Sequence, residues 1–178
     1  MLILSVLTIS GCSSSDDKFS KDRSSPDFID QLVPIALEYN KSKGPDNSNI
    51  PIKGKLYFWD MTNNGPFTPN NFDKIENTVT YNINESDQIT VFMIVNVKKK
   101  SLGNYQSYIK GVPETSKTVT GYRYYTDIIV MYWPEKTVVG WHRVTGADPT
   151  GENYIQGDAG IVYGYDLIYE WISSLPRT

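Results

Sequence analysis

His142 is the only histidine in this chain of 178 residues, so imidazole acid–base chemistry must come from it alone. Its partner depends on the hairpin turn that begins at Pro134. A loop of two residues places Asp127 opposite His142 and creates a carboxylate–imidazole pair, whereas a loop of three places Asp127 opposite Arg143 and creates a cross-strand ion pair. In either register a packed, hydrogen-bonded core histidine is favoured over a catalytic His142–Asp127 pair.

A second group of polar side chains lies in the loop at residues 146–160, where Asp148, Glu152 and Asp158 stand among glycines. Several carboxylates in one loop can hold Ca²⁺, which takes oxygen ligands. The alternating acidic spacing of an EF-hand is absent, so the sequence favours an ordinary solvated loop. A transition-metal site is disfavoured because the chain offers one His and one Cys. We therefore predict no metal and no cofactor.

Aromatic side chains are abundant, with 13 Tyr, 4 Trp and 6 Phe. The run Tyr122, Tyr124 and Tyr125, with Trp133 beyond it, suggests a stacking platform for a glycan or a peptide. On an extended strand, however, Tyr122 and Tyr124 share one face while Tyr125 and Trp133 share the other. Since one face must be core, a tyrosine-rich sheet is favoured over a binding role for the whole group.

Several catalytic signatures are missing, among them the G-x-S-x-G nucleophile elbow, the P-loop, the dinucleotide glycine fingerprint and H-E-x-x-H. The formal net charge of −3 argues against a nucleic-acid binder, which normally has a clustered basic face. The single basic run, at residues 98–100, is interpreted as a solvated turn. These observations favour a non-enzymatic protein, although carboxylate pairs leave little trace in a sequence.

The N-terminus carries the most specific motif. Residues 1–9 are an apolar run too short to span a bilayer and of the length found in signal peptides. Ile9-Ser10-Gly11-Cys12 follows, and it resembles the lipobox of bacterial lipoproteins, in which the cysteine is lipidated and becomes the new N-terminus. The resemblance implies permanent membrane attachment through acyl chains on Cys12. No Lys or Arg precedes the apolar run, which suggests that the natural start lies upstream.

The resemblance divides the chain into a signal peptide at residues 1–11, a lipidated cysteine with a polar tether at 12–25, and one globular domain at 26–178. The acidic pair Asp16-Asp17 resembles surface-export tags of Bacteroidetes-type lipoproteins. The expected location is the bacterial cell envelope, at the outer membrane, with the domain facing either the periplasm or the cell exterior.

The domain must position its polar residues with an α+β fold. Ser25 is predicted to cap a helix with Pro26 at its first position, a kink or break at Pro34, and an end before Gly44. An antiparallel sheet of five to six strands follows, with strands expected at residues 53–61, 78–83, 89–97, 102–109, 118–133 and 137–145. The apolar stripe of the C-terminal helix consists of Leu167, Ile168, Trp171, Ile172 and Leu175.

Taken together, the sequence predicts an envelope lipoprotein that is a non-enzymatic binding or accessory module for an envelope protein or glycan. The alternative is an envelope or extracellular hydrolase of glycans or peptides, which would use carboxylates such as Asp60, Asp127 or Asp148 with or without His142.

Overall fold

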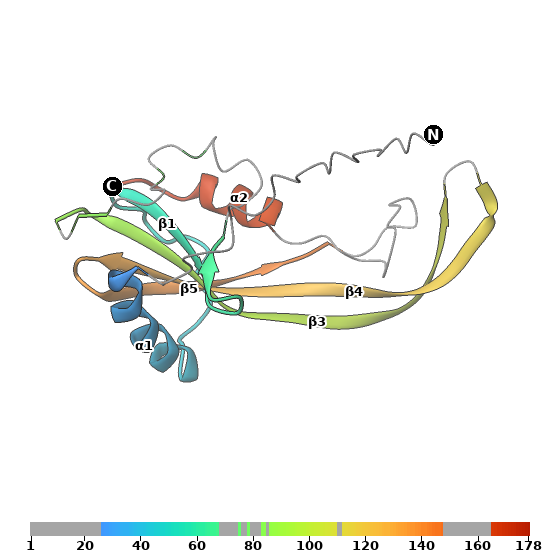
Figure 1. The fold of residues 1–178 in the computed structure, drawn as a ribbon, viewed down its shortest axis with the longest axis horizontal. Helices are drawn as coiled ribbons and strands as arrows, with labels where there is room; N and C mark the ends of the chain where they lie inside the picture. Colours follow the sequence, from blue (N-terminus) through green and yellow to red (C-terminus); the bar gives the residue numbers. More distant parts are fainter. Residues whose placement is uncertain are drawn as a thin grey trace, which may run out of the picture.

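The computed structural model describes residues 26–67, 75, 78, 83–84, 86–109, 112–147 and 165–178. The predicted α+β class is confirmed: a five-stranded, mostly antiparallel mixed sheet packs between an N-terminal and a C-terminal helix (Figure 1). The strand order is β2-β1-β3-β4-β5. The elements are α1 (Asp27–Lys41), β1 (Lys55–Asp60), β2 (Gly65–Pro66), β3 (Ile89–Ile109), β4 (Val112–Trp133), β5 (Thr137–Thr145) and α2 (Tyr165–Ser174).

One pair of neighbouring strands departs from the expected antiparallel arrangement. β1 runs parallel to β3, with Lys55 aligned to Ile89 and Asp60 to Ile94. A parallel pair needs a long crossover, and here the connection is the segment between β2 and β3. The predicted strand at residues 78–83 lies largely outside the described residues, and Thr78 forms an isolated bridge to Leu56.

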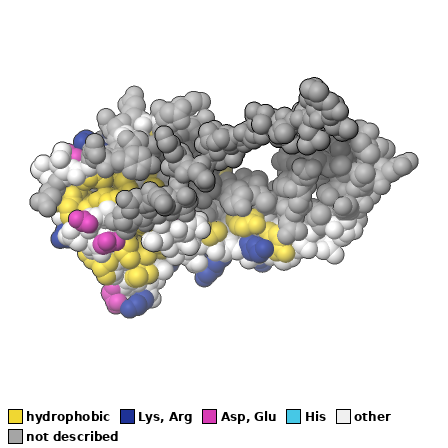
Figure 2. Space-filling view, viewed as in Figure 1, with side chains coloured by type: hydrophobic (Ala, Val, Ile, Leu, Met, Phe, Trp, Pro, Cys, Tyr) yellow, Lys and Arg dark blue, Asp and Glu magenta, His cyan; other side chains and the backbone are white. Residues whose placement is uncertain are grey.

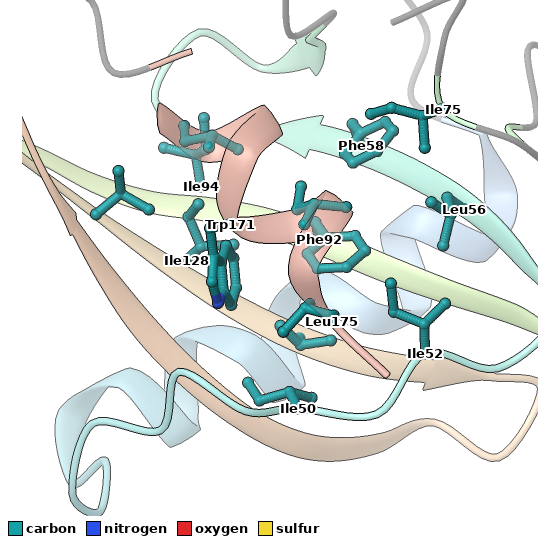
Figure 3. Close-up of a cluster of buried hydrophobic side chains, with 14 of the residues drawn as sticks. Ile50, Ile52, Leu56, Phe58, Ile75, Phe92, Ile94, Ile128, Trp171 and Leu175 are labelled. Carbon is teal, nitrogen blue, oxygen red and sulfur yellow. The ribbon is translucent and has the colours of Figure 1, made fainter. Parts of the chain in front are cut away.

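The sheet is covered on both faces, which explains why its central strands are almost continuously apolar. Alternate residues of β1, β3 and β4 point to opposite sides. One set packs with α2 into the cluster drawn in Figure 3, where Phe92 and Ile128 surround Trp171. The other set packs with Phe28, Ile29, Leu32 and Ala36 of α1. We refer to the two sides as the α2 face and the α1 face.

Helix α1 differs from its prediction in two respects. It begins at Asp27, so Pro26 is the capping residue and not the first helical one, and it has no side-chain cap hydrogen bond. The predicted cap, Ser25, lies outside the described residues. Pro34 does not divide the helix, which is continuous to Lys41. Because Pro34 is exposed and the apolar stripe continues past it, packing on the sheet holds the helix together despite the lost backbone donor.

The lysine run at residues 98–100 differs most from its prediction. Residues 98–100 do not form a turn, and the predicted strand at 102–109 does not fold back on residues 89–97. β3 continues through the lysines as one strand and pairs with β4 along its whole length. The two strands extend beyond the rest of the sheet as a long two-stranded arm (Figure 1). We call this arm together with its base, residues 97–109 and 112–126, the ribbon. At the base, Tyr125 and Thr126 also pair with β5.

We call the rest of the sheet, together with α1 and α2, the body. No described helix covers the ribbon, and this explains why the lysine run was wrongly predicted to be a turn. A strand buried on both faces must be apolar, but at the level of the ribbon both faces can reach water. Lysines can then occupy consecutive strand positions, and Lys98, Lys99 and Lys100 are all exposed. Bulges follow Ile94 and Ser101, where the pairing with β4 shifts.

The β4–β5 hairpin settles the register that the sequence left open. Next to the turn, Tyr132 pairs with Thr137, as a two-residue loop would require. A bulge after Val138 then inserts one residue into β5, so that Val130 pairs with Gly140. Consequently Asp127 stands opposite Arg143, and Ile128 stands opposite His142. The register expected from a three-residue loop is reached through the bulge.

Candidate functional site

A buried ion-pair network lies at the base of the ribbon on the α1 face. The carboxylate of Asp127 is 2% exposed. Arg143 donates to it through Nε and Nη2, at 2.6 and 3.0 Å. Nζ of Lys43 donates to Oδ2 at 2.8 Å, and the amide of Asn96 lies 3.5 Å from the same oxygen. Three strands, β3, β4 and β5, and the segment after α1 are thereby joined at one carboxylate.

This network keeps Asp127 ionised. Burial alone raises the pKa of the carboxyl group, but the hydrogen bonds from Arg143 and Lys43 and their charges outweigh it and hold the pKa at about 2. A carboxylate that is saturated with cationic donors is a poor proton carrier at neutral pH. Asp127 therefore fits a structural role at the point where the ribbon leaves the body.

His142 is not brought to Asp127. It lies on the α2 face, where its ring stacks at 4.6 Å from Trp171 and its Nδ1 is 2.7 Å from Oδ1 of Asp46. Its side chain is 18% exposed. This pair could not be predicted from residue spacing, because Asp46 lies in the loop after α1 and only the tertiary fold brings it to β5. His142 is thus a packed, hydrogen-bonded histidine.

The other candidate carboxylates are placed as follows. Asp60 is buried at the end of β1 and accepts hydrogen bonds from the backbone and side chains of Thr62 and Asn63, so it closes the turn that leaves the sheet. Asp148, Glu152 and Asp158 lie outside the described residues. Within the part of the chain that the structure describes, no group of His, Cys, Asp and Glu side chains is arranged to hold a metal ion.

The aromatic group divides between the core and the ribbon. Trp133 is 5% exposed and contacts Phe28 edge-on, so it belongs to the core beneath α1. Tyr122, Tyr124 and Tyr125 are half-buried side chains near the base of the ribbon. The predicted stacking group is therefore reduced to these three tyrosines.

Cations interleave with these aromatic rings. Nζ of Lys99 lies 4.3 Å from the centre of the Tyr122 ring on the α2 face. On the α1 face the guanidinium of Arg143 lies 6.0 Å from the ring of Tyr125 and 5.6 Å from that of Trp141. Such cation–π contacts hold long basic side chains over flat rings while their charged ends stay near water. The base of the ribbon thus presents a mixed basic and aromatic surface.

The sequence of the ribbon is basic in an otherwise acidic chain. Residues 97–126 contain six Lys or Arg and one Glu, a formal net charge of +5. Since the whole chain carries −3, the remaining residues carry −8. In Figure 2 basic side chains lie along the described base of the ribbon, while both acidic and basic side chains lie over the rest of the molecule.

Comparison with known proteins gives no family for this chain: no protein-family model, curated protein sequence or solved structure matches it. Within the described residues, no helix has the length and apolar character needed to cross a membrane.

Proposed function

We propose that this chain is a lipid-anchored envelope lipoprotein that acts as a non-enzymatic binding module and docks a partner macromolecule through the β3–β4 ribbon. The observation that carries the proposal is the ribbon itself, a basic, tyrosine-bearing arm that extends beyond the two helix-covered cores. The body supplies the stability, and the ribbon supplies the contact surface.

The energetics of the ribbon support this division of roles. An isolated two-stranded hairpin is marginally stable in water, and a third strand or a packed face is needed for independent stability. Ordering a long hairpin costs backbone entropy, at about 1–2 kcal/mol per residue, which the cross-strand contacts of an isolated hairpin barely offset. A partner that covers the ribbon would supply the missing contacts.

The network at Asp127 supports the same role, because it fixes the direction in which the ribbon leaves the body. Lys43, Arg143 and Asn96 approach Asp127 from three different segments of the chain. A rigid base reduces the orientational freedom that is lost on binding and so favours association.

The anchor is proposed from Ile9-Ser10-Gly11-Cys12 alone. Two acyl chains, each contributing about 0.8 kcal/mol per buried methylene, hold a protein at a bilayer stably. Mass spectrometry of membrane-extracted protein tests this part of the proposal. We expect the N-terminal peptide to begin at Cys12 and to carry the mass of acyl chains, and an unmodified Cys12 would contradict it.

One form of the hydrolase alternative, a catalytic His142–Asp127 pair, is not formed in this fold. His142 and Asp127 lie on opposite faces of the sheet, each with a different partner. No observation on the described residues therefore favours this function over binding.

Photocrosslinking in cells tests the docking surface. Val97 at the base of the ribbon and Leu37 on α1 are a matched pair, because they are 46% and 48% exposed and both are apolar. A photoreactive amino acid replaces each in turn in the full-length, lipidated protein. We expect a discrete crosslinked product from position 97 and none from position 37. Products of equal yield at both positions, or at position 37 alone, would refute the ribbon as the docking site.

A further inference from the structure

Among the described residues, no strand pairs with the outer edge of β3 along the ribbon. β1 pairs with β3 from Ile89 to Ile94, and Met61 donates a last backbone hydrogen bond to Ile94. The turn closed by Asp60 then leads the chain away into β2. From Val95 onward, no strand in the described part of the chain pairs with this edge of β3. A strand edge presents a row of backbone donors and acceptors that can pair with another extended chain.

Positive side chains line this edge. The register places Lys98 opposite Tyr125 and Lys100 opposite Arg123, on the face that also carries Asp127, while Lys99 points to the other face. Lys98 and Lys100 lie on one side of the strand. Their Cα atoms are about 7 Å apart, because alternate residues of any β-strand repeat at that distance. A strand added at this edge would lie about 5 Å away, with its own alternate side chains beside the two lysines.

The lysines of this edge make the site selective for acidic partners. A carboxylate on a strand added beside Lys98 or Lys100 would face a cation across the new pair, which is a favourable arrangement in a sheet. Lysines on an open edge also discourage pairing with apolar or basic strands, so the same residues that prevent aggregation select an acidic partner.

We infer that the open edge of β3 at residues 95–104 binds an extended acidic segment of a partner protein as an additional β-strand. Main-chain hydrogen bonds provide the affinity, and alternate Asp or Glu side chains of the partner contact Lys98 and Lys100. Side chains on the other face of the added strand lie beside the exposed Val97. The inference rests on the proposed function and specifies the partner at that surface.

Peptide binding to the full-length protein in detergent micelles tests this inference. The probe is a fluorescent eight-residue peptide of alternating Glu and Val, which places all carboxylates on one face of a strand. A second peptide has the same sequence with an N-methyl group on every backbone amide, which removes the hydrogen-bond donors of both strand edges and leaves the charge unchanged. Fluorescence anisotropy measures each affinity. We expect the N-methylated peptide, and a Gln-for-Glu peptide, to bind at least tenfold more weakly.

A matched pair of variants tests the lysines. In the double variant, Lys98→Ser with Lys100→Ser, we expect at least a tenfold loss of affinity for the Glu–Val peptide. Lys41→Ser removes an exposed lysine from α1 and is expected to change affinity less than twofold. Because the N-methylated peptide is tested on the unaltered protein, the conclusion does not depend on the folding of any variant.

Three outcomes would overturn the inference. They are no binding of the Glu–Val peptide, equal binding of its N-methylated form, and binding of polygalacturonate, an acidic glycan without amides, as tightly as the peptide. The last two would mark the ribbon as a general polyanion surface. A crosslinked partner at Val97 in cells together with any of these results would leave the proposed function intact and remove strand addition alone.

Discussion

At the scale of single residues, Asp127 is the clearest example of how the fold assigns a role. The sequence offered two partners for it, His142 and Arg143, and the deciding feature is one inserted residue in β5. A bulge of this kind follows from local backbone packing and has no signature in residue types. The other member of the hypothetical pair, His142, finds Asp46 instead, which lies far away in the sequence.

The pKa of Asp127 predicts a specific acid sensitivity. Its folded-state pKa of about 2 lies below the usual value of 3.8, so ionised Asp127 contributes stability that is fully present above about pH 4 and is lost as the pH falls towards 2. We expect Asp127→Asn to lower the free energy of unfolding by about 2–3 kcal/mol at pH 7, because charged hydrogen bonds are lost. Urea titrations at pH 7, 4 and 2 measure the difference.

The control for this variant is Glu38→Gln, which alters an exposed ion pair with Lys41 on α1. Such a pair contributes about 0–1 kcal/mol, so little change is expected at any pH. If Asp127→Asn and the unaltered protein lost stability in parallel between pH 4 and pH 2, Asp127 would not be held ionised by the network.

At the scale of elements, the sequence predicts most clearly where the helices and the sheet make their core. The apolar runs within β3 and β4, and the stripes of α1 and α2, were recognised because burial on both faces leaves a pattern. The ribbon was missed because its three consecutive lysines are exposed, so in the sequence they resemble the lysines of a turn. The kink or break predicted at Pro34 was wrong, because the packing of α1 on the sheet outweighs the local effect of a proline on the helix.

Hydrogen exchange tests whether the ribbon part of each long strand is less stable than the part that lies between the two cores. We expect the amides of residues 97–104 and 118–126 to exchange at least about a hundredfold faster than those of 89–94 and 128–132, because only the latter lie between two cores. Mass spectrometry of peptides from the full-length protein measures both. Similar protection along the whole of β3 would show that the ribbon is stabilised as firmly as the body.

At the scale of the whole molecule, charge and structure divide along the same line. The ribbon sequence, residues 97–126, carries a formal net charge of +5, whereas the rest of the sequence carries −8. The sequence predicted the α+β class but not the ribbon, since only the length of the β3–β4 pairing shows that the basic run belongs to an arm. The predicted aromatic group is reduced to the three tyrosines at the base of the ribbon, because Trp133 lies in the core.

The most direct test of the docking role is to shorten the ribbon. Residues 99–124 are replaced by Asn-Gly, which joins Lys98 to its partner Tyr125 through a two-residue hairpin turn and leaves both cores in place. The measurement is the yield of the partner crosslinked in cells to the tagged, lipidated chain. A melting curve within a few degrees of the original confirms that the body is folded. We predict that the partner is lost from the shortened chain, and its recovery in undiminished yield would contradict the ribbon's role.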